Sequence, residues 1–302
     1  MTYTVPTDRG ERPVAVIGAG TLGRRIALMF STRGGTTRIH DPSAEARLAA
    51  VDYVRRTLPE VLATIDGGTP GTVETCDDLA TAVRDAWLVV EAVPERLDLK
   101  IRLFGDLDRL AQPDAILASN SSSYASRLFL DRVSRPERVV NMHFYMPPST
   151  NGVDLISSGH TDRAILDLLL AELPRYGVHP FEARKESTGF IYNRVWAAIK
   201  REALAVVAEG VTTPEEFDRM WMINLHTVRG PFRMMDRVGL DVVLDIENHY
   251  AAENPHLPTA PRELLHRYVD AGHLGVKTGR GFYDDYPPAS RGDSSAGEKP
   301  VG

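Results

Sequence analysis

The sequence has a single cysteine, Cys76, among 302 residues. One cysteine excludes a disulfide bond within the chain and gives no metal-site pattern, so we expect a reducing, cytoplasmic setting and no bound metal. No apolar run reaches the roughly 18 residues that a membrane-spanning helix needs, and the N-terminus lacks the apolar segment of a secretory signal. We therefore expect neither secretion nor a membrane partner.

Positive charge is also scarce, since 35 Lys and Arg stand against 41 Asp and Glu, for a formal net charge of -6. That balance argues against nucleic acid or an anionic membrane as the main partner. Hydrophobic residues make up 43% of the chain, which is ample for packed cores, and the length allows two domains. The composition is that of an ordinary soluble globular protein.

The stretch VAVIGAGTLG, which ends at Gly23, has the pattern of a buried strand that enters a dinucleotide-binding turn. The first glycine, Gly18, permits the tight turn, Gly20 lets a pyrophosphate approach the backbone, and Gly23 lets helix and strand pack closely. The predicted helix over residues 22–30 directs its free N–H groups at the phosphates. The residues of this turn that we expect at the cofactor are Gly18, Gly20, Thr21, Leu22 and Gly23.

An acidic residue follows at the distance that an NAD site requires. The second predicted strand, residues 36–40, ends at Asp41, which is 21 residues after Gly20. A carboxylate there binds the ribose hydroxyls of NAD and repels the 2'-phosphate of NADP. Arg38 lies on the strand ahead of Asp41, where we expect it to point away from the ribose. The sequence predicts NAD as the cofactor.

Strands and helices then alternate along the chain, which predicts a Rossmann-type, doubly wound, mainly parallel α/β sheet. The further strands are expected at residues 73–75, 87–93, 115–118, 138–141, 153–157 and 179–183, and the helices between them at 43–65, 77–83, 97–110 and 162–176. From residue 189 onward the periodicity is helical only, over 191–209, 214–222, 232–247 and 261–271. We therefore predict a loose leader (1–12), an NAD-binding domain (13–186), an all-helical C-terminal domain (187–287) and a disordered tail (288–302).

Three polar features follow predicted strands, and ligands bind beyond the carboxyl ends of strands in such sheets. They are Glu95, the run Ser121–Ser123 and His143. Histidine is the usual acid/base group at neutral pH. A structural histidine, serines that only cap a helix, and a solvent-facing Asn193 in the helical region are the alternatives for these residues taken singly.

Taken together, seven segments resemble the L-3-hydroxyacyl-CoA dehydrogenase family, over nearly the whole stretch from Val14 to Tyr286. They are VAVIGAGTLG, VVEAVPERLDLK, LASNSSS, HF with a following proline, TGFIYNR, RGPF with DRVGLD, and KTGRGFYD. The resemblance implies two domains, with NAD on the first, the active site between them and a homodimer formed mainly through the helical domain.

The resemblance also implies roles for single residues. Ser122 is the serine that hydrogen-bonds the substrate oxygen, His143 is the acid/base, and Asn193 completes the polar pocket. The positions that match the family's cofactor contacts are Gly18, Gly20, Gly23, Asp41, Glu95, Lys100 and Lys277. In oxidation, neutral His143 would take the hydroxyl proton as hydride leaves for the nicotinamide.

The chain departs from the family pattern where the substrate is recognised. Asp154 stands in place of the family's glutamate beside the histidine, and Met146 replaces an asparagine. The segment over residues 44–68 is shorter than the family's lysine-rich hairpin and offers Arg55 and Arg56 to the phosphates of CoA. A 3-hydroxyacyl compound is the leading substrate, and a free hydroxy acid or a polyketide-like ketone is the alternative.

Two further interpretations stay open. A catalytically silent NAD-binding protein is possible in this superfamily, but a silent protein has no reason to keep Ser122, His143 and Asn193 together. Lys200 lies seven positions after Asn193 and hence on nearly the same helical face. Either Lys200 or Arg201 binds a substrate carboxylate, or they form an ion pair or cover apolar surface.

Overall fold

The computed structural model describes residues 3–286, so the tail predicted over 288–302 lies outside the described residues. The chain forms two compact units, Met1–Phe190 and Ile191–Gly302, each of which is described here by itself. Within residues 3–286, no helix is both long and apolar enough to cross a membrane.

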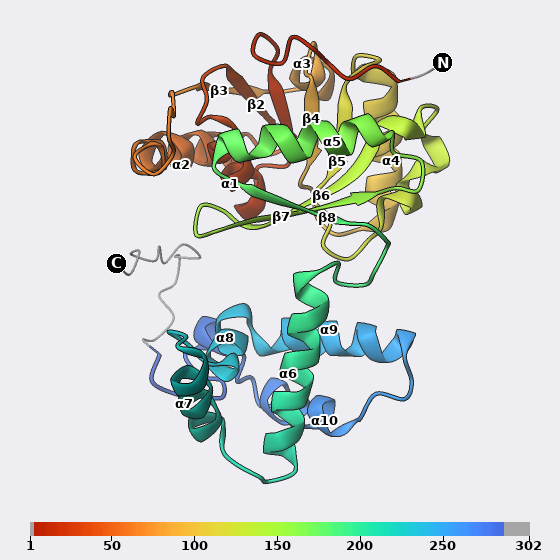
Figure 1. The fold of residues 1–302 in the computed structure, drawn as a ribbon. Coiled ribbons are helices and arrows are strands. Elements are labelled where there is room, and N and C mark those ends of the chain that lie inside the picture. The colour runs from red at the N-terminus through yellow and green to blue at the C-terminus, as the bar shows by residue number, and fades with distance from the viewer. Residues whose placement is uncertain (1–2, 287–302) are drawn as a thin grey trace. The chain divides into compact units, whose positions relative to one another are not determined.

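The first unit is built on one eight-stranded sheet with the order β3-β2-β1-β4-β5-β6-β7-β8 (Figure 1). All neighbouring strands are parallel except β6 and β7, which are antiparallel. The strands are β1 (Val14–Ile17), β2 (Thr36–His40), β3 (Thr72–Cys76), β4 (Leu88–Glu91), β5 (Ile116–Ser119), β6 (Val139–Met146), β7 (Thr150–Ser157) and β8 (His179–Ala183). The predicted doubly wound, mainly parallel sheet is confirmed.

Helices cover both faces of this sheet, as its apolar strands require. One hydrophobic cluster joins the sheet to α1 (Thr21–Phe30), α2 (Ala44–Leu62), α5 (Arg163–Glu172) and η3 (Leu173–Tyr176). A second cluster joins the opposite face to α3 (Leu79–Val83), α4 (Leu97–Leu110) and η1 (Ser126–Arg132). The short turn η2 (Pro136–Arg138) leads into β6.

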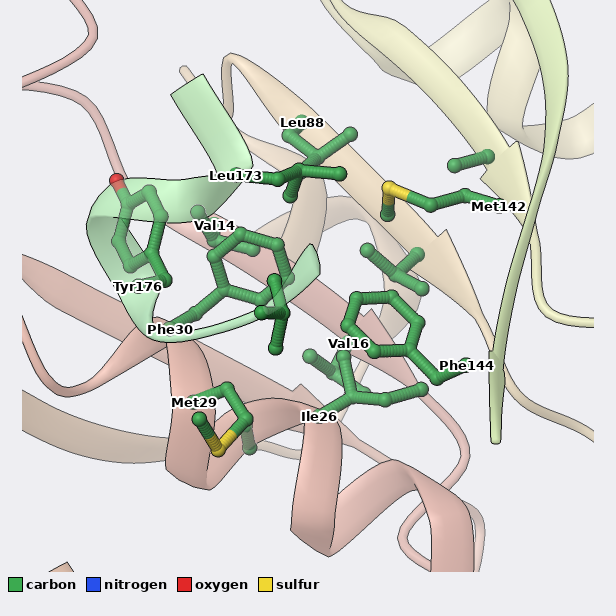
Figure 2. Packing of buried hydrophobic residues seen from close by; sticks show 14 of the residues in the cluster. Val14, Val16, Ile26, Met29, Phe30, Leu88, Met142, Phe144, Leu173 and Tyr176 are labelled. Atoms are coloured by element: carbon green, nitrogen blue, oxygen red, sulfur yellow. The ribbon is translucent and has the colours of Figure 1, made fainter. Parts of the chain in front are cut away.

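The first cluster holds α1 against the strand that carries the candidate histidine (Figure 2). The ring of Phe30, at the end of α1, packs edge-on against Phe144 of β6 at 6.2 Å and against Tyr176 at 5.0 Å between centroids. Such edge-to-face pairs stabilise beyond the apolar area that they bury. The glycine turn at the start of α1 and the middle of β6 are therefore parts of one packed core.

Strand β6 is longer than the pattern predicts, and this corrects the position of His143. The sequence predicts a strand over 138–141 with His143 beyond its end, but β6 continues to Met146. Pairing with β5 ends at Asn141, whereas the antiparallel partner β7 continues to pair as far as Met146. His143 consequently lies inside a strand, on the part of it that projects past the carboxyl end of β5.

The second unit contains helices and no strand among its described residues. The elements are α6 (Tyr192–Ala208), α7 (Pro214–Leu225), α8 (Pro231–Val238), α9 (Leu240–Glu253), α10 (Ala260–Val269) and the short η4 (Val276–Thr278). The all-helical character predicted for this region is confirmed. Its core includes Leu204 of α6, Phe232 of α8, Leu244 of α9 and Leu265 of α10.

The single helix predicted over 232–247 is wrong, because the structure divides it into α8 and α9. Gly239 separates them with φ of +105°, which helical residues do not adopt and which glycine tolerates. A continuous apolar periodicity on both sides of the glycine hid this break from the sequence pattern.

The N-terminal segment was expected to be loose, but residues 3–12 are attached to the first unit without forming a helix or strand. The hydroxyl of Tyr3 donates a hydrogen bond of 2.6 Å to the carbonyl of Asp114. Arg12 forms an ion pair of 2.6 Å with the carboxylate of Asp114 and donates to the carbonyl of Ala86 at 3.0 Å. Three polar contacts of this kind hold the segment where its composition alone predicts a free end.

A buried ion pair attaches α4 to the start of β6. Arg138 is fully buried and its guanidinium donates to the carboxylate of Asp108 at 2.9 and 3.2 Å. Burial alone would raise the pKa of Asp108, but hydrogen bonds from Ser134 and Arg138 hold it below its usual range. Asp108 is therefore ionised, and the pair fixes the entry into the strand that carries His143.

Replacing Arg138 by Met should lower the free energy of unfolding by about 3 kcal/mol, because it removes the closer and fully buried cation of Asp108 and leaves only the partly exposed Arg135, 3.6 Å away. Denaturant unfolding monitored by circular dichroism measures the change. The matched control is Arg109→Met on α4, the helix that carries Asp108. Arg109 pairs with Asp106 at the surface and should contribute less than about 0.5 kcal/mol. Equal losses in the two variants would contradict the importance of the buried pair.

Candidate functional site

The glycine turn between β1 and α1 has the geometry that its sequence predicts. Gly18 has φ of +109°, and a Cβ there would lie 2.5 Å from the carbonyl oxygen of Ala92, which directly follows the neighbouring strand β4. At Gly23 a Cβ would lie 1.9 Å from the carbonyl oxygen of Gly18, so only glycine lets α1 approach β1 this closely. A Cβ at Gly20 would meet no atom within 4 Å, so this side of the turn is open.

Asp41, at the end of β2, is fastened to this turn. Its Oδ2 accepts a hydrogen bond of 2.9 Å from the backbone N–H of Ala19, and its Oδ1 accepts one of 2.9 Å from the N–H of Ser43. Both carboxylate oxygens keep lone pairs for further donors. The structure thus brings Asp41 and the glycine turn together at one edge of the sheet.

Two arginines near Asp41 each donate a hydrogen bond to a backbone carbonyl and lie close to a carboxylate. Arg38 donates to the carbonyl of Arg84 at 2.6 Å and lies 3.6 Å from the carboxylate of Glu74. Arg47, which the sequence pattern did not single out, donates to the backbone carbonyl of Asp41 at 2.6 Å and pairs with Asp77. The positive charges on this side are therefore balanced by carboxylates or held by backbone carbonyls.

Glu91 is a buried acid at this edge of the sheet that sequence reasoning did not single out as a site residue. It ends β4 fully buried, and its Oε1 accepts hydrogen bonds from the Lys100 ammonium at 2.6 Å and the N–H of Val93 at 2.9 Å. Its Oε2 accepts one from Ser119 at 2.6 Å. The sequence did carry a signal, because Glu91 is the single acid in an otherwise apolar strand. A buried charge needs partners, so its position indicates a polar network at the end of this strand.

Lys100 and Glu95, both predicted at the cofactor, belong to the same network. Lys100 is 1% exposed and lies 3.1 Å from Glu95 as well as 2.6 Å from Glu91. Glu95 accepts a hydrogen bond from the hydroxyl of Ser121. The Lys100 charge is satisfied by two carboxylates, and this network links the loops that follow β4 and β5.

The serine loop after β5 is held in position by asparagines. The side chain of Asn141 accepts from the N–H of Ser126 at 2.6 Å and donates to the carbonyl of Ser121 at 3.4 Å. The Oδ1 of Asn120 accepts from the N–H of Phe144, next to His143, at 2.8 Å. Ser122 itself is exposed on this loop, and its Oγ lies 3.5 Å from that of Ser123.

His143 and Asp154 stand directly opposite each other in the β6–β7 pair. Directly opposed residues on one face of an antiparallel pair are in side-chain contact. His143 is 5% exposed and Asp154 is 1% exposed, and Nδ1 of the imidazole lies 3.4 Å from Oδ2 of the carboxylate. The shorter acid therefore reaches the histidine, at the outer limit of a hydrogen bond. Rings of Tyr145 and Phe190 pack on the imidazole at 4.7 and 5.4 Å.

The remaining predicted residues belong to the helical unit. Asn193 lies half-buried in the first turn of α6. The ammonium of Lys277 lies 2.5 Å from both carboxylate oxygens of Asp241, at the start of α9. No group of three His, Cys, Asp or Glu side chains in the described part of the chain is arranged to hold a metal ion.

A buried carboxylate on α9, Glu247, pairs with Arg201 and acts electrostatically on Lys200. Arg201 forms an ion pair of 2.8 Å with Glu247, as the ion-pair alternative predicts. Lys200 is 4% exposed, and burial lowers its pKa to about 8, with Glu247 opposing and Arg201 adding to the effect. A buried lysine with this pKa carries its charge below about pH 8 and loses it above.

The comparisons with known proteins cover most of both units. The sequence pattern described as "3-hydroxyacyl-CoA dehydrogenase, NAD binding domain" matches residues 13–187, and that described as "3-hydroxyacyl-CoA dehydrogenase, C-terminal domain" matches residues 189–285. A probable 3-hydroxybutyryl-CoA dehydrogenase of Bacillus subtilis is 32% identical over 285 residues, which is 90% of this chain and 97% of that protein.

Two other relatives extend this result. A 3-hydroxyacyl-CoA dehydrogenase-like protein of Cochliobolus heterostrophus is 42% identical over 163 residues, 53% of this chain, and the match spans about a third (34%) of that longer protein. A solved diketoreductase structure, described as acting on dicarbonyl compounds, superimposes with a TM-score of 0.76 at 28% identity and covers 91% of this chain and 99% of its own. The chain belongs to the 3-hydroxyacyl-CoA dehydrogenase family and is an NAD-dependent dehydrogenase that acts on a CH–OH group.

Proposed function

We propose that this protein interconverts a 3-hydroxyacyl and a 3-oxoacyl compound with His143 as the acid/base. The observation that carries the proposal is the buried pairing of His143 with Asp154 beside the carboxyl edge of an NAD-binding sheet. A buried histidine with an acidic partner is costly to keep in a protein that only binds a nucleotide. This favours catalysis over the silent alternative.

The glycine turn and Asp41 fit the cofactor. The open side of the turn at Gly20 admits a pyrophosphate to the backbone, and the free N–H groups of α1 face it. Asp41 has lone pairs left for the ribose hydroxyls, and Arg38 is held by Arg84 away from a 2'-phosphate. We assign the cofactor contacts to Gly18, Gly20, Thr21, Leu22, Gly23, Asp41, Glu95, Lys100 and Lys277.

The chemistry of this chain's own residues follows from the hydrogen bonds. NAD supplies a nicotinamide that exchanges hydride with the carbinol carbon. With its Nδ1–H directed at Asp154, the imidazole of His143 presents Nε2 as the free base, which takes the substrate's hydroxyl proton in oxidation and returns it in reduction. Ser122 and Asn193 orient the substrate oxygen and stabilise the charge that develops on it.

Replacing His143 by Gln should lower kcat in both directions by about 10³-fold, the usual size of a general acid/base contribution. Consumption of NADH with a 3-oxoacyl-CoA measures the rate, and fluorescence titration with NADH should show unchanged affinity. The control is His160→Gln, an exposed histidine of the same unit, which should keep full activity. Full turnover in the His143 variant would refute the proposal.

A cavity of about 340 Å³ between α1 and α2 favours a CoA-linked substrate. It is lined by Arg24, Arg55 and Arg56 together with Asp52 and Ala49. Asp52 lies 3.7 Å from Arg55 and balances one of the three charges. Three arginines close together can bind phosphate groups. They supply the positive charge that lysines provide in the longer hairpin of the family.

The double variant Arg55→Ala/Arg56→Ala should raise KM for a 3-oxoacyl-CoA about tenfold without changing kcat, since each lost phosphate contact weakens ground-state binding. The same variant should leave KM unchanged for the pantetheine thioester, which lacks the nucleotide phosphates. The exposed pair Arg102→Ala/Arg109→Ala on α4 is the control. Equal KM changes for both thioesters would remove this cavity from substrate binding.

The alternative substrate, a free hydroxy acid or a polyketide-like ketone, rests on the connection between β6 and β7. Met146 is 37% exposed where the family has an asparagine, and the diketoreductase shares the fold over nearly the whole chain. The pocket beside the nicotinamide is then shaped for a different acyl group. Turnover of the free acid or an aromatic ketone in place of the CoA ester would favour this alternative.

We also propose a cytoplasmic homodimer formed through the helical unit. Helix α7 exposes Met220 at 53%, Ile223 at 63% and Leu225 at 53%. Met220 and Ile223 are three positions apart and lie on one face of the helix, which forms an apolar α7 surface, and a second copy of this unit is the partner that the family resemblance implies. The single buried cysteine fits a reducing compartment.

Replacing Ile223 by Glu should convert the dimer into a monomer, because a charge at the centre of the α7 surface cannot be desolvated. Light scattering after size-exclusion chromatography measures the mass. Leu48→Glu is the matched control, since Leu48 is 62% exposed on α2 of the other unit. A wild-type chain that is already monomeric, or a dimer that survives the Ile223 change, would contradict the proposal.

A further inference from the structure

The residue that most closely engages Asp154 is a tyrosine. The hydroxyl of Tyr145 donates a hydrogen bond of 2.5 Å to Oδ2 of Asp154, the same oxygen that lies 3.4 Å from His143 Nδ1. Short O–H···O⁻ bonds of this length are charge-assisted and about twice as strong as neutral ones. The carboxylate is 1% exposed, so the phenol is a principal partner of its negative charge.

The strand irregularity beside Tyr145 makes this contact possible. Tyr145 is two residues after His143 and lies on the same face of β6. The β6–β7 register shifts between Phe144 and Met146, so two residues of β7 stand opposite Tyr145. One of them is Gly152, where a Cβ would lie 3.2 Å from Cδ2 of the tyrosine ring. The ring therefore rests over a position without a side chain and reaches Asp154 from there.

We propose that Tyr145 is a positioning residue that fixes the Asp154 carboxylate and shares its negative charge, and so weakens the attraction of that carboxylate for a proton on His143. This inference rests on the proposed acid/base role of His143. Tyr145 and His143 compete for one carboxylate oxygen, and the phenol is the closer donor. Asp154 consequently orients Nδ1–H without pairing fully with an imidazolium.

The described neighbours of the imidazole fix the sign of the effect. They are Asp154 on β7, Tyr145 on β6 and the uncharged Phe190. Removing the phenol hydroxyl leaves the negative charge of Asp154 wholly to His143, and a nearby opposite charge favours the protonated imidazole. Oxidation needs the neutral ring, so when the pH is lowered the variant should lose oxidation activity at a higher pH than the wild type does. Reduction needs the protonated ring, so when the pH is raised the variant should keep reduction activity to a higher pH than the wild type does.

The test is Tyr145→Phe, which removes one oxygen atom. The acidic limb of kcat/KM for oxidation should move up by about one pH unit, and the basic limb for reduction should move in the same direction. In the protein without cofactor, the ring resonances of His143, assigned by their loss in His143→Gln, should show the same upward shift of protonation. Unmoved limbs and an unmoved resonance would overturn the proposal.

Three further variants separate this effect from a loss of packing. Tyr3→Phe also loses a tyrosine hydrogen bond, to the carbonyl of Asp114, and should leave the pH profile unchanged. Gly152→Ala crowds the Tyr145 ring and should shift the profile in the same direction as Tyr145→Phe, even if the latter folds poorly. In an Asp154→Asn background, Tyr145→Phe should produce no additional shift, because the two residues act as a unit.

These outcomes also separate the inference from the proposed function. An active His143→Gln variant would refute the acid/base assignment, while the His143 resonance would still report whether Tyr145 controls its protonation. An inactive His143→Gln variant together with a Tyr145→Phe variant that shows the wild-type pH profile and resonance would refute only the role of Tyr145.

Discussion

The antiparallel pairing of β6 with β7 is the constraint on which the candidate site depends. The strands from β3 to β6 in the sheet order are parallel and end near one edge, and β6 continues past that edge because β7 goes on pairing with it. Register then leaves no freedom: His143 faces Asp154, and a shift of one residue would turn one of these side chains to the opposite face. A flexible loop could carry the same two residues, but it could not hold their separation within a few tenths of an ångström.

The edge of the sheet around this pair contains buried ion pairs. Glu91, Lys100 and Glu95 join the loops after β4 and β5, and Asp108 with Arg138 anchors the start of β6. Ion pairs of this kind contribute little net stability, but each is costly to break from one side, so they specify one arrangement of the loops. The polar groups near the cofactor edge are thus held by electrostatics, whereas α1 is held by apolar packing around Phe30.

Much of the fold could be predicted from the sequence, because apolar periodicity and glycine spacing are local signals. The parallel strands, the glycine turn and Asp41 are of this kind. Long-range pairing was not predictable: nothing between residues 138 and 141 shows that β6 extends to Met146, since its partner lies later in the chain. The helix break at Gly239 was not predictable either, because the apolar pattern continues across it. The network of Glu91 was also not predictable, because its partners Lys100 and Ser119 lie on later elements of the chain. Asp154 is a shorter acid than the glutamate that the family has beside the histidine, and strand register places it directly opposite His143.

One contact at the far end of this connection bears on how substrate preference can change. Arg25, on the helix that begins at the glycine turn, donates a hydrogen bond of 2.8 Å to the carbonyl of Pro147. The segment between β6 and β7 is therefore attached to the nucleotide-binding helix as well as to its own strands. Exchanging this segment for that of a relative would replace the residues around Pro147 and leave their contact residue on α1, Arg25, unchanged. A change in the segment between β6 and β7 therefore has to be matched by a change on α1.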